Sequence, residues 1–283
     1  EIYHPNKLDF AINGGGDDKL VRSLYFASIP GTPIPENQNL YKRKNAKIVS
    51  CNTHALATAF NIVNSVFEKR YGKNEFENKL RDKIFVNFAR RFDDPHKGKI
   101  KPEFVTTSHK PYHIEEIDYL VPEVAGKVDT FYSKWPTEFF HNLTIIMDFK
   151  DKISYELIDD IKLAVQTYPR SILVEDEISH KRTMDAAKWA RIEDADIPFP
   201  VYMIDKLGNY KICINALTPQ RGIVAPSTAD YVLLRTGLIK DINSWEEVFD
   251  YVNKNAKFRN ENFTHIKDSV QDNLLNYELR KPQ

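Results

Sequence analysis

The sequence predicts an α+β fold, and three observations carry that prediction. Strand-like and helix-like segments follow one another along the 283 residues without the strict strand–helix–strand repeat of a purely parallel sheet. No internal repeat or low-complexity block interrupts them. Hydrophobic residues make up 42% and charged residues 28% of the chain, the balance of a globular protein with a sizeable core.

The first fifty residues favour short strands. Residues 8–12 are predicted to form one strand, which stops at the triple-glycine turn beginning at Gly14. Residues 20–28 form a second apolar strand, and residues 46–50 a third that leads directly into Cys51.

Helical periodicity begins just after Cys51. Over residues 53–71 apolar residues recur every three or four positions, and Gly72 supplies a C-terminal stop. Residues 154–168 repeat this pattern with Ser154 as the N-cap. The other segments with helical character are residues 228–238, residues 244–254 and the tail 256–283, where Ile266, Val270 and Leu274 are four apart.

Further strands are expected at residues 84–89, 128–135 and 143–149, and a hairpin at residues 201–204 and 210–217. Residues 90–101 form a charged loop in this interpretation. His113, Glu115 and Glu116 are expected in a solvated loop, and Lys47 in a solvated basic loop with residues 42–44.

The composition excludes several classes of protein. Lys and Arg total 40 and Asp and Glu total 40, which disfavours a strongly basic nucleic-acid-coating protein. The mean hydropathy is −0.49 and no apolar run approaches the roughly 18 residues of a membrane span, so no membrane association is expected. Two cysteines predict a reducing, cytoplasmic location, and no spacing of ligands predicts a metal site.

Cys51 is the sharpest chemical feature. It stands where a strand ends and a helix begins, and the unpaired N–H groups of a helix N-terminus stabilise a thiolate. A buried structural cysteine is the alternative interpretation, and it is the one favoured for Cys213 in the middle of a strand. His54 either faces Cys51 across one helical turn or lies at the surface beside the cap.

Several motifs then follow in one order. Ser50-Cys51-Asn52-Thr53 resembles the nucleophile motif of glyceraldehyde-3-phosphate dehydrogenases of the archaeal type. The later segments that resemble the same family are Ala89–Pro95 with Lys99, Ser108-His109, residues 136–141, and Gln220, Val224, Pro226 and Asp230. Together they span roughly residues 8 to 255.

The resemblance implies a fold and a set of roles. The fold would be the catalytic-domain type of that family, a mixed or antiparallel sheet with helices on one face. Cys51 would attack an aldehyde carbonyl, His109 and His141 are the candidate proton partners, and hydride would pass to NAD or NADP. The candidate anion-binding residues are Arg90, Arg91, Asn52 and Thr53.

The same resemblance carries departures. Only fifty residues precede Cys51, so residues 1–50 are expected to be the remnant of a nucleotide-binding region, residues 51–255 the catalytic-like domain and residues 256–283 a helical tail. Leu143 stands where the family strand has a second histidine, and Lys110 where its loop has another. A leucine cannot transfer protons.

These departures predict a degenerate homologue, with no cofactor and no NAD-dependent activity, that acts as a binding or structural subunit. Its partner would be another protein or a second copy of the chain. The alternative is an active phosphorylating oxidoreductase that uses Cys51 with an NAD(P) domain supplied upstream or by another chain. A second alternative is association with nucleic acid through the basic residues 42–47.

Overall fold

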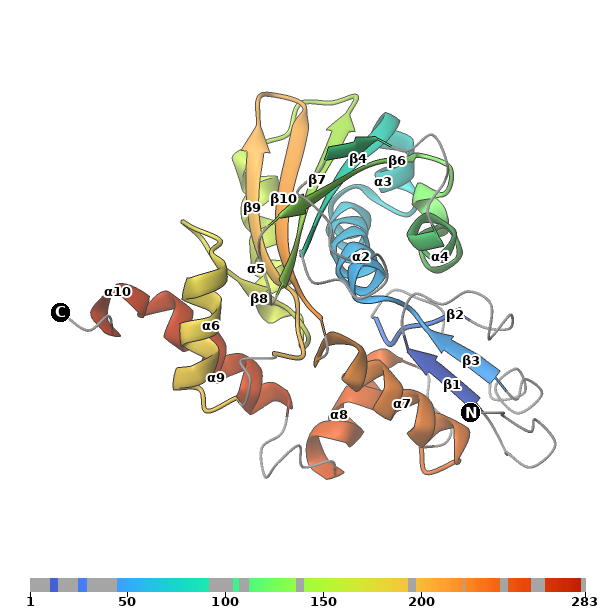
Figure 1. Cartoon of the computed structure of the whole chain (residues 1–283). Coiled ribbons are helices and arrows are strands. Elements are labelled where there is room, and N and C mark those ends of the chain that lie inside the picture. Colours follow the sequence, from blue (N-terminus) through green and yellow to red (C-terminus); the bar gives the residue numbers. More distant parts are fainter. Residues whose placement is uncertain are drawn as a thin grey trace.

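The computed structural model describes residues 11–14, 25–29, 45–91, 104–106, 112–135, 140–192, 197–220, 222–239, 244–255 and 263–280. Within these residues the chain builds a large mixed sheet, a layer of helices on one face of it, and a second cluster of helices around a small parallel sheet (Figure 1). The predicted α+β class is confirmed. No described helix is long and apolar enough to cross a bilayer.

The large sheet has seven strands in the order β5-β6-β4-β7-β10-β9-β8. The β4–β6 and β8–β9 pairs are parallel and the other pairs are antiparallel. Its strands are β4 (Leu80–Arg91), β5 (Phe104–Thr106), β6 (Val128–Trp135), β7 (Phe140–Phe149), β8 (Ile172–Leu173), β9 (Val201–Leu207) and β10 (Lys211–Pro219). The predicted hairpin is the β9–β10 pair.

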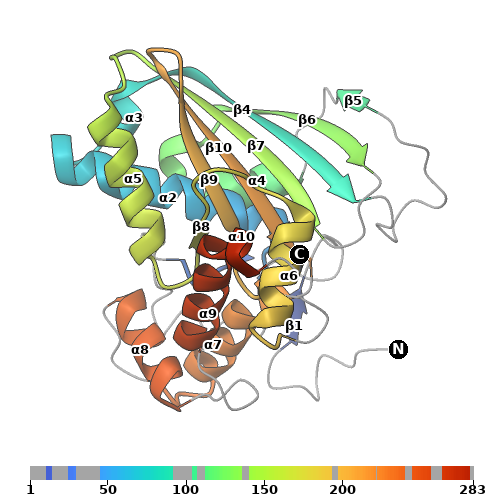
Figure 2. The same ribbon diagram turned by 90° about the vertical axis from the view of Figure 1, so that its left-hand side faces the viewer.

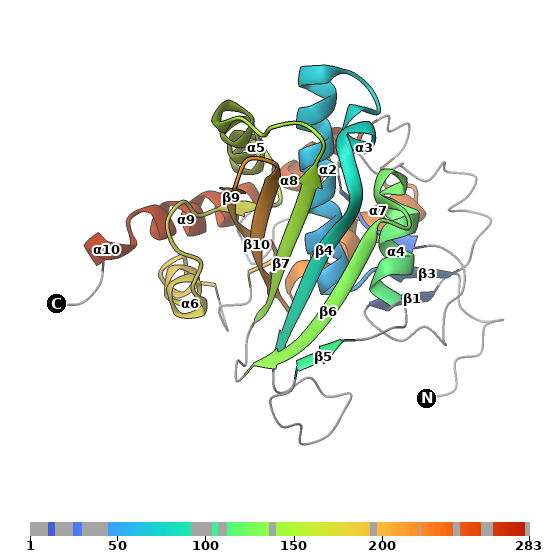
Figure 3. The ribbon, with the colours of Figure 1, turned by 90° about the horizontal axis from the view of Figure 1, so that it is seen from above.

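One face of this sheet is covered by α2 (Cys51–Tyr71), α4 (Tyr112–Leu120) and α5 (Tyr155–Thr167) (Figure 3). Along β7 every second side chain is fully buried against these helices, and the residues between them are half-buried. The period of two follows from the pleat of a strand with one covered face. Small elements complete this layer: α3 (Glu75–Lys79) and the 3-10 turn Pro122–Val124.

A second apolar core lies at the end of the sheet. Here β1 (Ala11–Gly14), β3 (Asn45–Ile48) and β2 (Tyr25–Phe26) form a small parallel sheet in that order. Figure 2 shows the helices that gather beneath the large sheet. They are α6 (His180–Trp189), α7 (Ala225–Arg235), α8 (Trp245–Asn255), α9 (Phe263–Leu275) and α10 (Tyr277–Arg280), with the 3-10 turn Gly222–Val224 before α7.

The C-terminal tail packs on its own chain. Ile266, Val270 and Leu274 of α9 are buried in this second core. The side-chain amide of Gln271 accepts from the N–H of Leu173 at 2.8 Å and donates to the carbonyl of Leu173 at 2.6 Å. It therefore satisfies the backbone at the edge strand β8 as a neighbouring strand would.

Several sequence interpretations are wrong in the described part of the chain. Arg90 and Arg91, expected at the start of a charged loop, are the last two residues of β4. The segment expected as a solvated loop is α4, with His113 and Glu116 on its buried side. Lys47, expected in a solvated basic loop, is 1% exposed at the end of β3. Cys213 is half-buried on the open face of the sheet and not in the core. The errors at Lys47 and Glu116 have one cause: each charged side chain was expected to face water, and its partner of opposite charge holds it inside.

Candidate functional site

The site is built on the turn between β3 and α2. The strand ends at Ile48, Ser50 is the N-cap, and Cys51 is the first residue of the helix. The Ser50 hydroxyl accepts from the N–H of Thr53 at 3.3 Å, which satisfies one of the donors left open by the helix geometry. The first turn of α2 carries no acidic residue. The positive end of a 21-residue helix is therefore directed at the thiol of Cys51.

The half-buried Cys51 thiol lies between two polar side chains from the sheet. His141 of β7 places Nδ1 3.9 Å from the sulfur. Gln220, directly after β10, donates from Nε2 to the sulfur at 3.5 Å. In the β7–β10 register His141 is opposite Thr218, two residues before Gln220. The sheet therefore brings both side chains to the mouth of α2.

Asn52 fixes the ring of His141. Its Oδ1 lies 3.0 Å from His141 Nδ1, and both side chains are buried. An amide oxygen only accepts, so this nitrogen carries the proton. The same N–H faces the sulfur, so His141 and Gln220 both present donors to Cys51. Two donors and a helix N-terminus favour the thiolate, which is the nucleophilic form of cysteine.

The structure places the other predicted site residues as follows. Extending the β4–β7 register by one residue from Ala89–Asn142 puts Arg90 opposite His141, on the helix-covered face with Phe88 and Val86. Arg91 is the last residue of β4, and its side chain lies outside the described part of the chain, as does all of His109. Asn52 orients His141, and Thr53 turns away from the thiol into a buried polar cluster.

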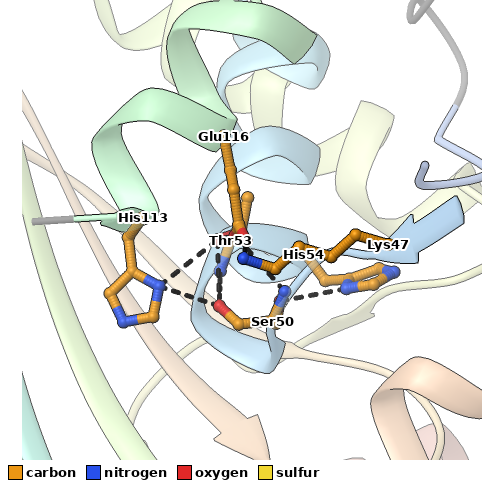
Figure 4. Close-up of polar contacts among 6 residues, drawn as sticks. All are labelled: Lys47, Ser50, Thr53, His54, His113 and Glu116. Carbon is orange, nitrogen blue, oxygen red and sulfur yellow. Dashed lines mark hydrogen bonds and ion pairs between the residues drawn. The ribbon is translucent and has the colours of Figure 1, made fainter. Parts of the chain in front are cut away.

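That cluster, which we call the cap cluster, consists of Lys47, Ser50, Thr53, His113 and Glu116 (Figure 4). Lys47 and Glu116 form an ion pair at 2.9 Å, with side chains 1% and 0% exposed. Glu116 also accepts from the N–H of Ser50 at 3.4 Å and from the Thr53 hydroxyl. The Ser50 hydroxyl lies 2.8 Å from Nδ1 of His113.

A second buried chain of hydrogen bonds reaches the same turn from the other side. His54 donates from Nδ1 to the carbonyl of Ser50 at 3.0 Å and accepts at Nε2 from the Ser227 hydroxyl at 2.9 Å. Ser227 in turn contacts Ser28, which accepts from Arg170 at 2.7 Å. Arg170 is held by both oxygens of Asp230, at 2.5 and 3.1 Å. The chain ties α7 and the β2 end to the nucleophile turn.

Burial keeps both histidines of these networks neutral. Burial lowers the pKa of His54 to about 4, against the backbone hydrogen bonds that favour its charged form. Burial, together with the charges of Arg90 and Lys47, holds the pKa of His113 well below its ordinary value. His54 therefore neither faces Cys51 nor lies at the surface, and both sequence alternatives for it are wrong.

Sequence reasoning missed Lys47, His113 and Glu116. Ile114, Ile117 and Leu120 are spaced by three and are buried, a pattern that indicates α4. No local signal pairs Glu116 with a lysine 69 residues earlier (116 − 47), because that contact exists only once the helix packs. Among the described residues, no group of three His, Cys, Asp or Glu side chains could hold a metal ion.

A thiol at a helix mouth with a histidine beside it is the arrangement of enzymes that form covalent intermediates on cysteine. Comparison with known proteins finds two curated relatives. The chain is 25% identical over 244 residues to the glyceraldehyde-3-phosphate dehydrogenase of Methanocaldococcus jannaschii, covering 82% of this chain and 64% of that protein. It is 29% identical over 214 residues to that of Picrophilus torridus, covering 71% and 56%.

No protein-family model matches the chain. The two alignments confirm the predicted relationship: the chain is related to archaeal glyceraldehyde-3-phosphate dehydrogenases. It spans about three fifths of the length of these curated relatives.

Proposed function

We propose that the chain is the catalytic part of a glyceraldehyde-3-phosphate dehydrogenase-type oxidoreductase that works through a covalent intermediate on Cys51. The observation that carries the proposal is the thiol geometry. The sulfur stands at the first position of α2, with the N–H of His141 3.9 Å away and the amide of Gln220 3.5 Å away.

The residues suggest the order of events. Thiolate attack on an aldehyde carbonyl forms the S–C bond, and the electron pair of the C=O bond moves to oxygen. The N–H of His141 is a donor beside the reacting sulfur, so it can donate a hydrogen bond to this oxygen and stabilise its negative charge. Arg90 lies opposite His141 on the neighbouring strand, when the β4–β7 register is extended by one residue, and it is the candidate partner for an anionic group of the substrate.

Oxidation of the resulting thiohemiacetal needs a hydride acceptor, which a nicotinamide cofactor supplies when it is bound. Among the described residues no strand, glycine-rich turn and helix follow one another in the way that holds a pyrophosphate. The described residues therefore offer no site for the cofactor's pyrophosphate. The predicted absence of a cofactor stays a prediction.

Acyl transfer tests the thiol without a redox step. An acyl phosphate such as acetyl phosphate reacts with a thiolate to give a thioester and inorganic phosphate. We expect Cys51 to be acetylated, as shown by intact and peptide mass spectrometry. His141→Leu removes this donor and should slow the reaction about 10²-fold or more, since one positioned donor to the developing oxyanion contributes that much. His265→Gln, an exposed histidine on α9, is the matched control.

Cys213 is an internal reference in the same experiment. Burial and the nearby Asp205 raise the pKa of its thiol, so it should stay unmodified. Equal labelling of Cys51 and Cys213, or no effect of His141→Leu, would contradict the proposal.

The second candidate function is a non-catalytic binding or structural subunit of an assembly. Leu143, at the position of the second histidine in the resemblance, is fully buried in the sheet core and offers no proton-transfer group. This candidate predicts an unreactive Cys51 together with a stable complex in native extract. Light scattering that finds only a monomer there would oppose it.

A further inference from the structure

The N-terminus of α2 has a capping arrangement in which one part comes from another helix. In a capping box the N-cap hydroxyl accepts from the N–H of the third helical residue, and an acid at that residue returns to the N-cap N–H. Ser50 supplies the first half. The third residue is Thr53, which has no carboxylate, and the N–H of Ser50 donates instead to Glu116 of α4.

Glu116 therefore joins the three elements that meet at the nucleophile turn. Its carboxylate accepts from Ser50 and Thr53 at the start of α2 and pairs with Lys47 at the end of β3. Residues 48–50 separate Lys47 from Cys51. The Lys47 ammonium, just before this segment, and the Ser50 N–H, at its end, both bind the carboxylate of Glu116, which restricts the segment. These contacts hold the backbone directly before Cys51.

The pair also balances charge at the N-terminus of α2, where Cys51 is the first helical residue. A lone carboxylate at this point would oppose the helix N-terminus and disfavour a thiolate, and Lys47 cancels it inside the protein, where water does not screen either charge. The other titratable groups at the turn are His54 of α2, His113 of α4 and His141 of β7, and the charge of Arg90 on β4 acts on His113.

We propose that Glu116, with Lys47 as its counterion, is a positioning residue that completes the cap of α2 from a neighbouring helix and sets the reactivity of the Cys51 thiol. The inference rests on the proposed function, since it concerns the same thiol. It adds a second role to a buried pair that would otherwise serve only stability.

Single-charge variants separate this role from a purely structural one. The measurement is the rate of Cys51 alkylation by iodoacetamide as a function of pH, with the modified peptide identified by mass spectrometry. Lys47→Met leaves the carboxylate unbalanced and should move the midpoint of the profile to higher pH. Glu116→Gln leaves the ammonium unbalanced and should move it to lower pH. Each shift should be about half a unit to one unit.

A merely structural pair would produce slower alkylation in both variants with no opposed shifts. Shifts in the same direction, or folded variants with the wild-type midpoint, would overturn the proposal. Glu115→Gln is the matched control, since Glu115 is the exposed neighbour on the same helix and should leave the profile unchanged.

Two further variants keep the test decisive if an unpaired charge prevents folding. Lys47→Met combined with Glu116→Gln removes both charges and should return the midpoint to the wild-type value. Glu116→Asp keeps the charge but shortens the side chain, so the midpoint should stay and the plateau rate should fall. A wild-type plateau for Glu116→Asp would contradict the positioning role.

The result is distinguishable from failure of the proposed function. If wild-type Cys51 reacts no faster than Cys213, the proposed function fails whatever the variants do. If wild-type Cys51 is reactive and its profile does not respond to Lys47 and Glu116, only this inference fails.

Discussion

The N-termini of α2 and α5 are built from the same device in two settings. Both helices begin after a serine whose hydroxyl accepts from the third N–H of the helix, at 3.3 Å in α2 and 3.2 Å in α5. In α5 the acid of the first turn is its own Glu156, which is exposed and hydrogen-bonded to Ser154, an interaction that lowers the pKa of the carboxyl. In α2 the acid comes from another helix and is buried.

The difference shows what a reactive thiol requires of a helix mouth. At α5 the positive end of the helix dipole interacts with Glu156, an acidic residue of the same helix that is in contact with water. The first turn of α2 has no acidic residue, so the helix dipole can stabilise a thiolate at Cys51. The N-cap residue Ser50 is hydrogen-bonded to the carboxylate of Glu116, and Lys47 balances the charge of that carboxylate. The cost is a buried ion pair, which is stable only while both partners are present.

Breaking the pair at α2 gives the largest expected effect on stability. Lys47→Met should lower the free energy of unfolding by about 3–5 kcal/mol, because it leaves a buried carboxylate without its partner. Lys162→Met on α5 removes an exposed pair with Glu175, at 3.0 Å, and should cost less than about 1 kcal/mol. Urea denaturation measures both. Equal losses at the two helices would contradict the contrast.

As the pH falls, the stability contributed at the N-terminus of α2 should be lost before the stability contributed at the N-terminus of α5. The pKa of His54 is about 4 in the folded protein and about 6.5 when unfolded, so the unfolded state takes up the proton first as the pH falls. The contribution is fully present above pH 6.5 and is lost between pH 6.5 and 4, on the order of 3 kcal/mol. The pKa of Glu156 is lowered from its ordinary value of 4.5, so its contribution begins to be lost only near the lower end of that window.

Urea midpoints at several pH values, for the wild type and His54→Gln, test this expectation. The variant should lose the His54 part of the pH dependence, while His265→Gln should keep it because His265 is exposed. A wild-type protein equally stable at pH 7 and pH 4.5 would show that His54 is not buried in its neutral form.

Replacing each of the two capping serines by alanine should change the free energy of unfolding by a smaller amount, and the two losses should differ. Ser154→Ala should cost about 1 kcal/mol, the ordinary value for an N-cap. Ser50→Ala should cost about 2 kcal/mol, because it also leaves buried groups of Thr53 and His113 without the hydroxyl. Thermal unfolding of both variants measures the difference, and an equal cost would mean that the cap cluster adds nothing to the cap of α2.

The smallest effect is expected at the exposed acid of α5. Glu156→Gln should leave the urea midpoint unchanged, since water and salt screen the interaction of this carboxylate with the helix N-terminus. Hydrogen exchange at the first turn of α5 is the sensitive measurement. A large loss of global stability would mean that this cap is coupled to the core as the cap of α2 is.

Much of this architecture was predictable from local pattern. The strand predicted at residues 128–135 matches β6, and the periodicity of residues 154–168 with Ser154 as N-cap matches α5 within one residue at each end. The junction at Cys51 is also local, and α2 begins there. These predictions hold because periodicity and capping act between residues a few positions apart.

The site was predictable only in part. Cys51 and His141 carry motifs, and the structure brings them within 3.9 Å of each other. Gln220 entered the sequence argument only as part of a motif, and its contact with the sulfur follows from the end of β10. The segment of His113 and Glu116 was misjudged because its charges outweighed the buried isoleucines between them.

The sequence by itself determined the α+β class, the helix that starts at Cys51 and the relationship to archaeal glyceraldehyde-3-phosphate dehydrogenases. Only the tertiary structure decided that Lys47 and Glu116 are buried together and that a carboxylate from α4 caps α2. The physical reason is that the burial of a charge depends on its partner. The attraction that offsets desolvation acts between groups that are distant in the chain and close only in the folded molecule.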